Sequence, residues 1–212
     1  MLCRQHVLCV NLKPPCCRNA TRFRSTVGGL EQERSGFLCL HSRAITALAL
    51  TIGVLGGVAT YLALSPFGMG LQIWAAFLGW ASFFHCGGKE KGFLDSALAN
   101  VWGAIMAGLT LLAVSRTGLA DTLTLPIWAG ICVAIGVALM ILGAKLPLLS
   151  AIPAAVYGYA ATVALTLLTQ SGLDNLTAQS LANPVANVAA SMVIGAVFGY
   201  VSEKIAGLLA KT

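Results

Sequence analysis

Charged residues are scarce in this chain of 212 residues. It has 13 Lys and Arg and 7 Asp and Glu, together 9% of the residues, whereas soluble domains carry roughly 25%. A soluble protein of this size needs such side chains to cover its surface with polar groups. The shortage therefore excludes an ordinary water-soluble domain. The abundant residues are hydrophobic, at 58% with a mean hydropathy of +0.84, and they predict an all-α bundle of membrane helices.

Sequence motifs of catalysis are also missing. The chain contains no Gly-x-Ser-x-Gly, no His-Glu-x-x-His, no complete phosphate-binding loop and no paired carboxylates. Five of the seven cysteines lie in the first 43 residues, where the Cys and His spacings match no standard zinc pattern. We therefore expect no enzymatic activity, no cofactor, no metal site and no disulfide framework in the apolar part of the chain.

Residues 1–43 differ from the rest of the chain in charge. They hold seven Lys and Arg and two Glu, so the basic balance belongs to this tail and indicates no nucleic-acid partner. The tail has Pro14-Pro15, Gly28-Gly29 and no apolar run of membrane length, so we expect it to be disordered. It is either a targeting segment or the product of a misassigned start, with initiation near Val27 or Leu38. We favour the misassigned start.

Apolar runs of membrane length fill the chain from Ala44 onward. About 20 residues cross a hydrocarbon core of roughly 30 Å at 1.5 Å per residue. The expected spans are 44–64, 67–86, 93–114, 123–143, 146–168 and 181–201. We therefore predict a six-helix transmembrane domain over residues 44–205, followed by a short C-terminal tail, 206–212.

Basic residues are distributed unevenly between the predicted loops, which bears on orientation because short loops rich in Lys and Arg stay cytoplasmic. If the N-terminus is inside, the opposite side holds only Arg116. The cytoplasmic side then holds the seven basic residues of the tail with Lys89, Lys91, Lys145, Lys204 and Lys211. We predict that both termini are cytoplasmic.

Short segments of the first half recur in the second half in the same order. Residues 75–81 resemble 154–160 at an offset of 79, and residues 98–100 and 52–54 resemble 181–183 and 135–137 at an offset of 83. Each half would have three spans, an odd number, so the second copy would enter from the opposite side. The pattern predicts a 3+3 inverted repeat, which in many transporters places the solute path at the repeat interface.

Small residues four positions apart occur in every predicted span and allow close helix packing in lipid. These pairs are Gly53 with Gly57, Ala75 with Gly79, Ala104 with Gly108, Gly130 with Ala134, Ala154 with Gly158, and Gly195 with Gly199. We expect them to bring helices of one molecule together, although a homodimer face is the alternative.

Amides within the spans are the first candidates for a site. Asn100, Asn183 and Asn187 should face the bundle interior, because an amide in hydrocarbon needs a partner. They could line a pore or form hydrogen bonds that only fix helix register. Asn100 and Asn183 occupy matching positions of the repeat, so they would line two symmetric ends of one path.

Aromatic residues give two further pore-lining candidates, Trp80 and Tyr159, which each follow the glycine of the repeated segment. His85, beside Cys86 at a helix end, is a weak pH-sensor candidate whose ordinary interpretation is an interfacial histidine. No span has Asp, Glu, Lys or Arg near its centre, which argues against ion coupling.

The stretch at residues 74–92 reads Trp-Ala-Ala-Phe-Leu-Gly-Trp-Ala-Ser-Phe-Phe-His-Cys-Gly-Gly-Lys-Glu-Lys-Gly, and Leu-Ala-Asn follows at 98–100. With these patterns, residues 44–205 resemble the bacterial inner-membrane family known as domain of unknown function 1097. The resemblance implies a small multi-pass protein of the bacterial inner (plasma) membrane without an assigned activity. No functional residues can be transferred from it, and the tail departs from the family pattern.

Two functions remain open from the sequence. The first is a channel or facilitator for a small uncharged solute. The alternative is a structural or regulatory membrane protein that acts through helix–helix or partner contacts without transport. The partners implied are the lipid bilayer, a small uncharged solute in the first case, and a second copy of the chain if it forms a homo-oligomer.

Overall fold

The computed structural model describes residues 28–66 and 70–210, and within these ranges all regular structure is helical. The helices are α1 (Gly28–Leu64), α2 (Ile73–His85), α3 (Lys89–Arg116), α4 (Leu119–Leu123), α5 (Leu125–Leu142), α6 (Ile152–Leu168) and α7 (Pro184–Leu209). Short 3₁₀ turns, η2 (Gly143–Lys145), η3 (Pro147–Leu149) and η4 (Asp174–Thr177), lie in the connections. The chain divides into two compact units, 1–46 and 47–212.

The helix α1 begins earlier than the sequence analysis expects. Residues 28–43 are helical, whereas we expected an irregular tail up to residue 43. Leu, Glu, Gln and Arg at positions 30–34 are good helix formers, and no proline interrupts the chain between them and Leu64. The expectation for residues 1–27 lies outside the described residues.

Proline and glycine set the helix boundaries within residues 70–210. Pro126, Pro153 and Pro184 occupy the first turns of α5, α6 and α7, where the missing N–H costs no helical hydrogen bond. The turn between α2 and α3 contains Gly87 and Gly88 at φ of 88° and 67°, a backbone conformation that glycine adopts without strain.

Helix length separates the elements into two groups. Four helical segments are long and apolar enough to cross a membrane: 44–64, 89–116, 125–145 and 184–209. The other two predicted spans are shorter helices, α2 with 13 residues and α6 with 17, or about 20 and 26 Å at 1.5 Å per residue. Four helices therefore support the helical membrane class. Each of the six predicted spans overlaps a helix, and the count of six crossings stays a prediction.

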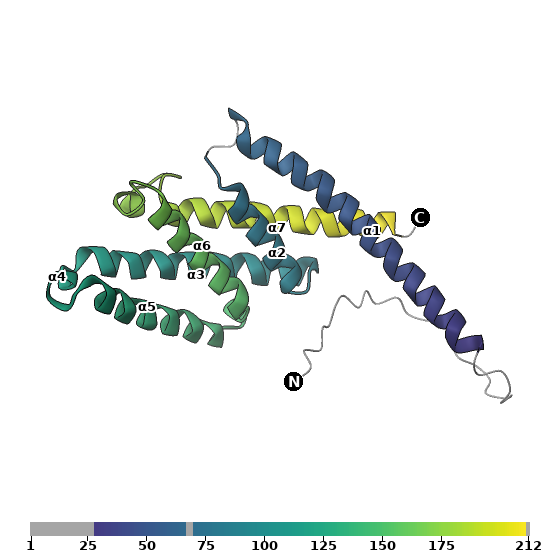
Figure 1. The fold of residues 1–212 in the computed structure, drawn as a ribbon, viewed down its shortest axis with the longest axis horizontal. Helices are drawn as coiled ribbons and strands as arrows, with labels where there is room; N and C mark the ends of the chain where they lie inside the picture. Colours follow the sequence, from purple (N-terminus) through teal and green to yellow (C-terminus); the bar gives the residue numbers. More distant parts are fainter. Residues whose placement is uncertain (1–27, 67–69, 211–212) are drawn as a thin grey trace. The chain divides into compact units, whose positions relative to one another are not determined.

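Each short helix packs mainly on one long helix (Figure 1). α2 lies across α7, α6 lies across α3, and α5 runs beside α3. One core cluster joins α3, α5 and α6 through Ala99, Met106, Ala107, Met140, Ala154, Ala155 and Tyr159. A second joins α2, α6 and α7 through Ala75, Ala161, Val188 and Met192. The long helices α3 and α7 also contact each other.

Glycines lie where the short helices cross the long ones. At the α2–α7 crossing, a Cβ on Gly79 would clash with the carbonyl oxygen of Met192, and one on Gly195 with that of Ala76. At the α6–α3 crossing, a Cβ on Gly158 would clash with the carbonyl oxygen of Asn100, and one on Gly103 with that of Ala155. The backbones therefore touch at both crossings.

Not every predicted small-residue pair contributes to packing. Gly79, Gly158 and Gly195 lie at the crossings, and a Cβ on Gly108 would clash with the side chain of Val185 in α7. In contrast, a Cβ added to Gly53, Gly57 or Gly130 would meet no atom of the described residues within 4 Å. The expectation of close packing is therefore wrong for the pairs on α1 and α5, because Gly53, Gly57 and Gly130 are exposed.

Lys89, Lys91 and Lys204 lie at one end of the bundle. The backbone N–H of Lys89, at the start of α3, donates to Glu203 near the end of α7 at 2.7 Å, so these helix ends lie together. Lys91 pairs with Asp95, and the Lys204 ammonium lies 5.0 Å from the centre of the Tyr200 ring. Arg116 ends α3 at the opposite end.

Candidate functional site

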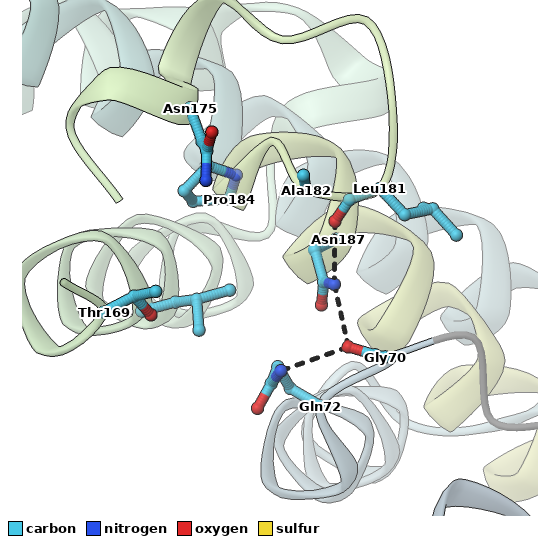
Figure 2. A pocket seen from close by; sticks show the side chains of 9 residues that line it. Gly70, Gln72, Thr169, Asn175, Leu181, Ala182, Pro184 and Asn187 are labelled. Carbon is cyan, nitrogen blue, oxygen red and sulfur yellow. Dashed lines mark hydrogen bonds between the residues drawn. The ribbon is translucent and has the colours of Figure 1, made fainter. Parts of the chain in front are cut away.

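A pocket lined by polar and apolar residues opens where α2 and α7 begin and α6 ends (Figure 2). Its volume is about 320 Å³, at the lower end of small-molecule sites, roughly 300–1,000 Å³. The lining residues are Gly70, Gln72, Leu165, Thr169, Asn175, Leu181, Ala182, Pro184 and Asn187. None of these nine residues is charged, so the pocket offers amides, a hydroxyl and backbone groups beside apolar side chains.

Asn187 is the predicted site residue that lies in this pocket. Its side chain is 6% exposed, and its amide nitrogen donates to the carbonyl oxygens of Gly70 and Leu181, both at 3.0 Å. The hydroxyl of Ser191 lies 3.4 Å from the Asn187 amide oxygen and accepts the backbone N–H of Gln72 at 3.0 Å. These bonds tie the start of α2 to α7 and fix the wall between them.

Asn183 has a structural role at the start of α7. Its side-chain oxygen accepts the backbone N–H of Val185 at 2.9 Å, and its nitrogen donates to the carbonyl oxygens of Leu176 and Ala178 at 2.8 and 3.1 Å. The residue is the N-cap of α7 and does not belong to the pocket lining. The predicted span 181–201 placed it inside a helix, whereas α7 begins at Pro184 because Asn183 caps it.

Asn100 lies in the middle of the bundle, away from the pocket lining. Its side chain is 0% exposed, and its amide nitrogen donates to the hydroxyl of Ser82 at 3.2 Å, which joins α3 to α2. Asn100 and Asn183 therefore have different surroundings. At the crossings, the carbonyl oxygen of Asn100 lies against Gly158 of α6, and that of Met192 lies against Gly79 of α2. The counterpart of Asn100 is therefore Met192, whereas the sequence analysis expected Asn183.

Trp80 lies between α2 and α7 with 4% of its surface exposed. Its indole N–H donates to the hydroxyl of Ser202 at 3.1 Å, and its ring stacks on Phe77 with a centroid distance of 5.9 Å. A satisfied hydrogen bond and a stacked ring describe a packing residue, and Trp80 is not among the pocket residues.

Tyr159 is buried in the cluster of α3, α5 and α6, with 8% exposure. Its hydroxyl has no hydrogen-bond partner among the described residues. A buried polar group without a partner costs about 1–3 kcal/mol. Tyr159 therefore differs from Trp80, although both follow the glycine of the repeated segment.

His85 ends α2 and is exposed. Its Nδ1 lies 3.4 Å from the hydroxyl of Tyr157 on α6, and the two rings meet edge to face with centroids 6.0 Å apart. Within the described ranges, 28–66 and 70–210, no group of three or more His, Cys, Asp or Glu side chains is arranged to hold a metal ion. The Cys-rich tail lies mostly outside these ranges.

Sequence reasoning missed Thr169 and Asn175 of the pocket and the partners Ser82 and Ser202. Thr169 and Asn175 are in or beside a polar connection, where such residues are ordinary and carry no signal of their own. The two serines donate or accept across helices, and only the register of the crossings decides which serine meets which partner.

The fold defines a class of protein: an all-helical bundle whose longest apolar helices can cross a membrane, with a neutral pocket at one end. Comparison with known families makes this specific. A family model described as "Protein of unknown function (DUF1097)" matches residues 49–207, so the chain belongs to this family and the resemblance found in the sequence is confirmed. No curated protein matches the chain. No solved structure matches it either.

Proposed function

We propose that the protein is a six-crossing bundle of the bacterial inner membrane, built as a 3+3 inverted repeat, that gives passive passage to a small uncharged solute. It acts in the lipid bilayer without enzymatic activity. The observation that carries the proposal is the correspondence between the two helix crossings.

The residue contacts at the crossings correspond under two constant offsets. Adding 79 to Ala76 and Gly79 of α2 gives Ala155 and Gly158 of α6, and adding 92 to Asn100 and Gly103 of α3 gives Met192 and Gly195 of α7. The glycine-to-carbonyl contacts of one crossing then map onto those of the other. This supports two halves, α1–α3 and α5–α7, of three helices each.

A second pair of contacts supports the same offset between α3 and α7. The rings of Phe93 and Tyr200 lie 6.2 Å apart, and Val185 packs against Gly108. An offset of 92 converts Phe93 into Val185 and Gly108 into Tyr200, so each contact is the counterpart of the other. Short helices at matching places in two halves, here α2 and α6, are a pointer to the solute path of such proteins.

Charge placement supports a neutral solute and the orientation of the bundle. Helices α2, α5 and α6 contain no Asp, Glu, Lys or Arg, so these three helices offer no such group to couple passage to protons or ions. Lys89, Lys91 and Lys204 lie at one end of the bundle. The positive-inside rule makes this end cytoplasmic, with both termini inside and the pocket on the other side.

The function is tested by flux through purified protein in liposomes. Acetamide and urea should enter faster than in empty vesicles when vesicle swelling is followed by stopped-flow light scattering. Acetate and guanidinium, their charged counterparts, should show no protein-dependent entry. Equal rates for acetamide with and without protein would contradict the proposal.

A second candidate function is a structural or regulatory membrane protein, alone or as a homo-oligomer. It is favoured by the hydrogen bonds that engage both ends of the Asn183 amide and link Trp80 and Asn100 to neighbouring helices. These side chains hold the bundle together whether or not a solute passes. Absence of flux for every neutral probe would favour this function.

A further inference from the structure

We propose that the pocket between α2, α6 and α7 binds an uncharged molecule that both donates and accepts hydrogen bonds, through Asn175, Thr169 and Gln72. The inference deepens the proposed function and rests on it for the role of the pocket in passage. Binding itself can be measured separately from passage.

One wall of the pocket already has its hydrogen bonds made. Both N–H groups of the Asn187 amide are engaged, by Gly70 and Leu181. The carbonyl oxygen of Gly70 accepts from Asn187 at 3.0 Å and from the Gln72 amide at 3.1 Å, as the dashed lines in Figure 2 show. A carbonyl oxygen has two lone pairs, so this wall shapes the pocket and offers a guest few further bonds.

The opposite side of the pocket has open groups. The side chains of Asn175 and Thr169 make no hydrogen bond within the described residues, and Asn175 is half-buried. An amide supplies two donor hydrogens and an acceptor oxygen, and a hydroxyl supplies one donor and two lone pairs. Gln72 adds one N–H, because its other N–H goes to Gly70 and its oxygen accepts from Trp74. The open groups therefore include donors and acceptors.

The absence of charge in the lining decides the class of guest. An ion that left water for this pocket would lose hydration and find no counter-charge among the nine lining residues, which is costly. A neutral amide, urea or polyol would exchange hydrogen bonds with water for bonds with Asn175 and Thr169. The chemistry of the lining thus selects small neutral polar molecules over ions of the same shape.

The protein carries a reporter for this pocket. The indole N–H of Trp74 donates to the side-chain oxygen of Gln72 at 3.1 Å, so a guest that bonds to Gln72 alters the surroundings of the indole. We expect acetamide and urea to produce a saturable change in the fluorescence of the detergent-solubilised full chain. Trp74→Phe should remove this change, which separates Trp74 from the other tryptophans.

Affinity should lie in the millimolar range, because small ligands gain at most about 1.5 kcal/mol per non-hydrogen atom and acetamide has few such atoms. Asn175→Leu and Thr169→Val should each raise the Kd for acetamide about fivefold, because each removes one hydrogen bond to the guest and a hydrogen bond usually changes affinity by about this factor. Thr177→Val is the matched control, since Thr177 lies in the same connection, is exposed and is not a lining residue. It should leave the Kd unchanged.

The charged isosteres test the ligand class on the unmodified chain, without dependence on variant folding. Acetate and guanidinium should give no saturable signal at concentrations where acetamide and urea saturate. Acetate binding as strong as acetamide binding, or no saturable acetamide signal, overturns the inference. Binding without liposome flux leaves the pocket standing and defeats the facilitator function. If Asn175→Leu and Thr169→Val leave the acetamide flux unchanged, the facilitator function stands and the pocket has no role in passage.

Discussion

The crossing of α2 with α7 and the crossing of α6 with α3 have the same backbone contacts but different side chains around them. Each places two glycines against carbonyl oxygens of the partner helix. Around the first, Trp80 donates to Ser202. Around the second, the hydroxyl of Tyr159 has no partner within the described residues. The comparison teaches that close backbone approach defines the architecture, and that the side-chain chemistry is free to differ between the halves.

Asn100 gives a second example of side chains that differ between the two halves. It bonds to Ser82 across α3 and α2, and the offsets of 92 and 79 turn this pair into Met192 and Ala161. Those two residues belong to the apolar cluster of α2, α6 and α7. A polar pair in one half thus has an apolar counterpart in the other. The hydrogen bond of Asn100 therefore belongs to one half only and is not part of the repeated architecture.

The largest expected effect comes from breaking the backbone contacts. Gly195→Ala and its counterpart Gly103→Ala each place a Cβ against a backbone carbonyl oxygen, which cannot rotate away. We expect each to cost about 3 kcal/mol of unfolding free energy, at the upper part of the range for overpacking. Thermal unfolding in detergent should show a decrease in the unfolding midpoint that is similar for the two variants.

Gly53→Ala is the matched control for these variants, because no atom lies within 4 Å of the added Cβ among the described residues. In a helix, alanine is favoured over glycine by about 1 kcal/mol, so this variant should be neutral or more stable. Unequal losses for Gly195→Ala and Gly103→Ala, or a loss as large for Gly53→Ala, would break the correspondence between the crossings.

A smaller effect is expected from the cap of α7, which sharpens the distinction between Asn183 and Asn100. Asn183→Ala removes the N-cap bond to Val185 and the bonds to Leu176 and Ala178. Loss of such a cap costs about 0.5–2 kcal/mol. Unfolding midpoints should fall while the Kd for acetamide stays the same. A lost acetamide signal in a variant with an unchanged midpoint would make Asn183 a site residue after all.

The next effect concerns the polar pair of the first half. Ser82→Ala should cost about 1 kcal/mol, because it leaves the fully buried amide of Asn100 unpaired. Ser82→Ala combined with Asn100→Met reproduces the apolar pair Ala161 and Met192, and it should recover most of that loss. A double-mutant cycle measures the coupling. Additive losses would show that the two halves do not offer equivalent surroundings at this place.

Several features of the fold could be predicted from the sequence because they depend on local patterns. Apolar runs located the six helices of the predicted spans, and proline and glycine marked their ends. The length of α2 could not be predicted, since the apolar run from Phe67 includes Gly70 at a φ of 72° and hydropathy does not distinguish such a turn from a helix. The cap role of Asn183 was available in the sequence, as Asn followed by Pro is typical of a helix start.

The site was less predictable. Among the predicted residues, Asn187 lies in the pocket, whereas Trp80, Tyr159 and Asn100 lie in packed parts of the bundle. An amide in an apolar run signals only that a partner exists. Which partner it meets depends on helix crossings that bring together residues distant in sequence, such as Gln72 with Ser191.

The smallest effect distinguishes the two aromatic residues of the repeated segment. Trp80→Phe removes the donor to Ser202 and should cost about 0.5–1.5 kcal/mol, the net value of one hydrogen bond, in addition to the smaller ring's lost packing. Tyr159→Phe removes a hydroxyl that has no partner in the described residues, so the unfolding midpoint should stay the same or rise slightly. Both variants keep an aromatic ring, but Trp80→Phe also removes part of a buried ring, so its loss should exceed the value of the hydrogen bond alone. If Tyr159→Phe lowers the midpoint as much as Trp80→Phe does, the Tyr159 hydroxyl is bonded in the membrane-embedded protein, and the side-chain contrast between the two crossings disappears.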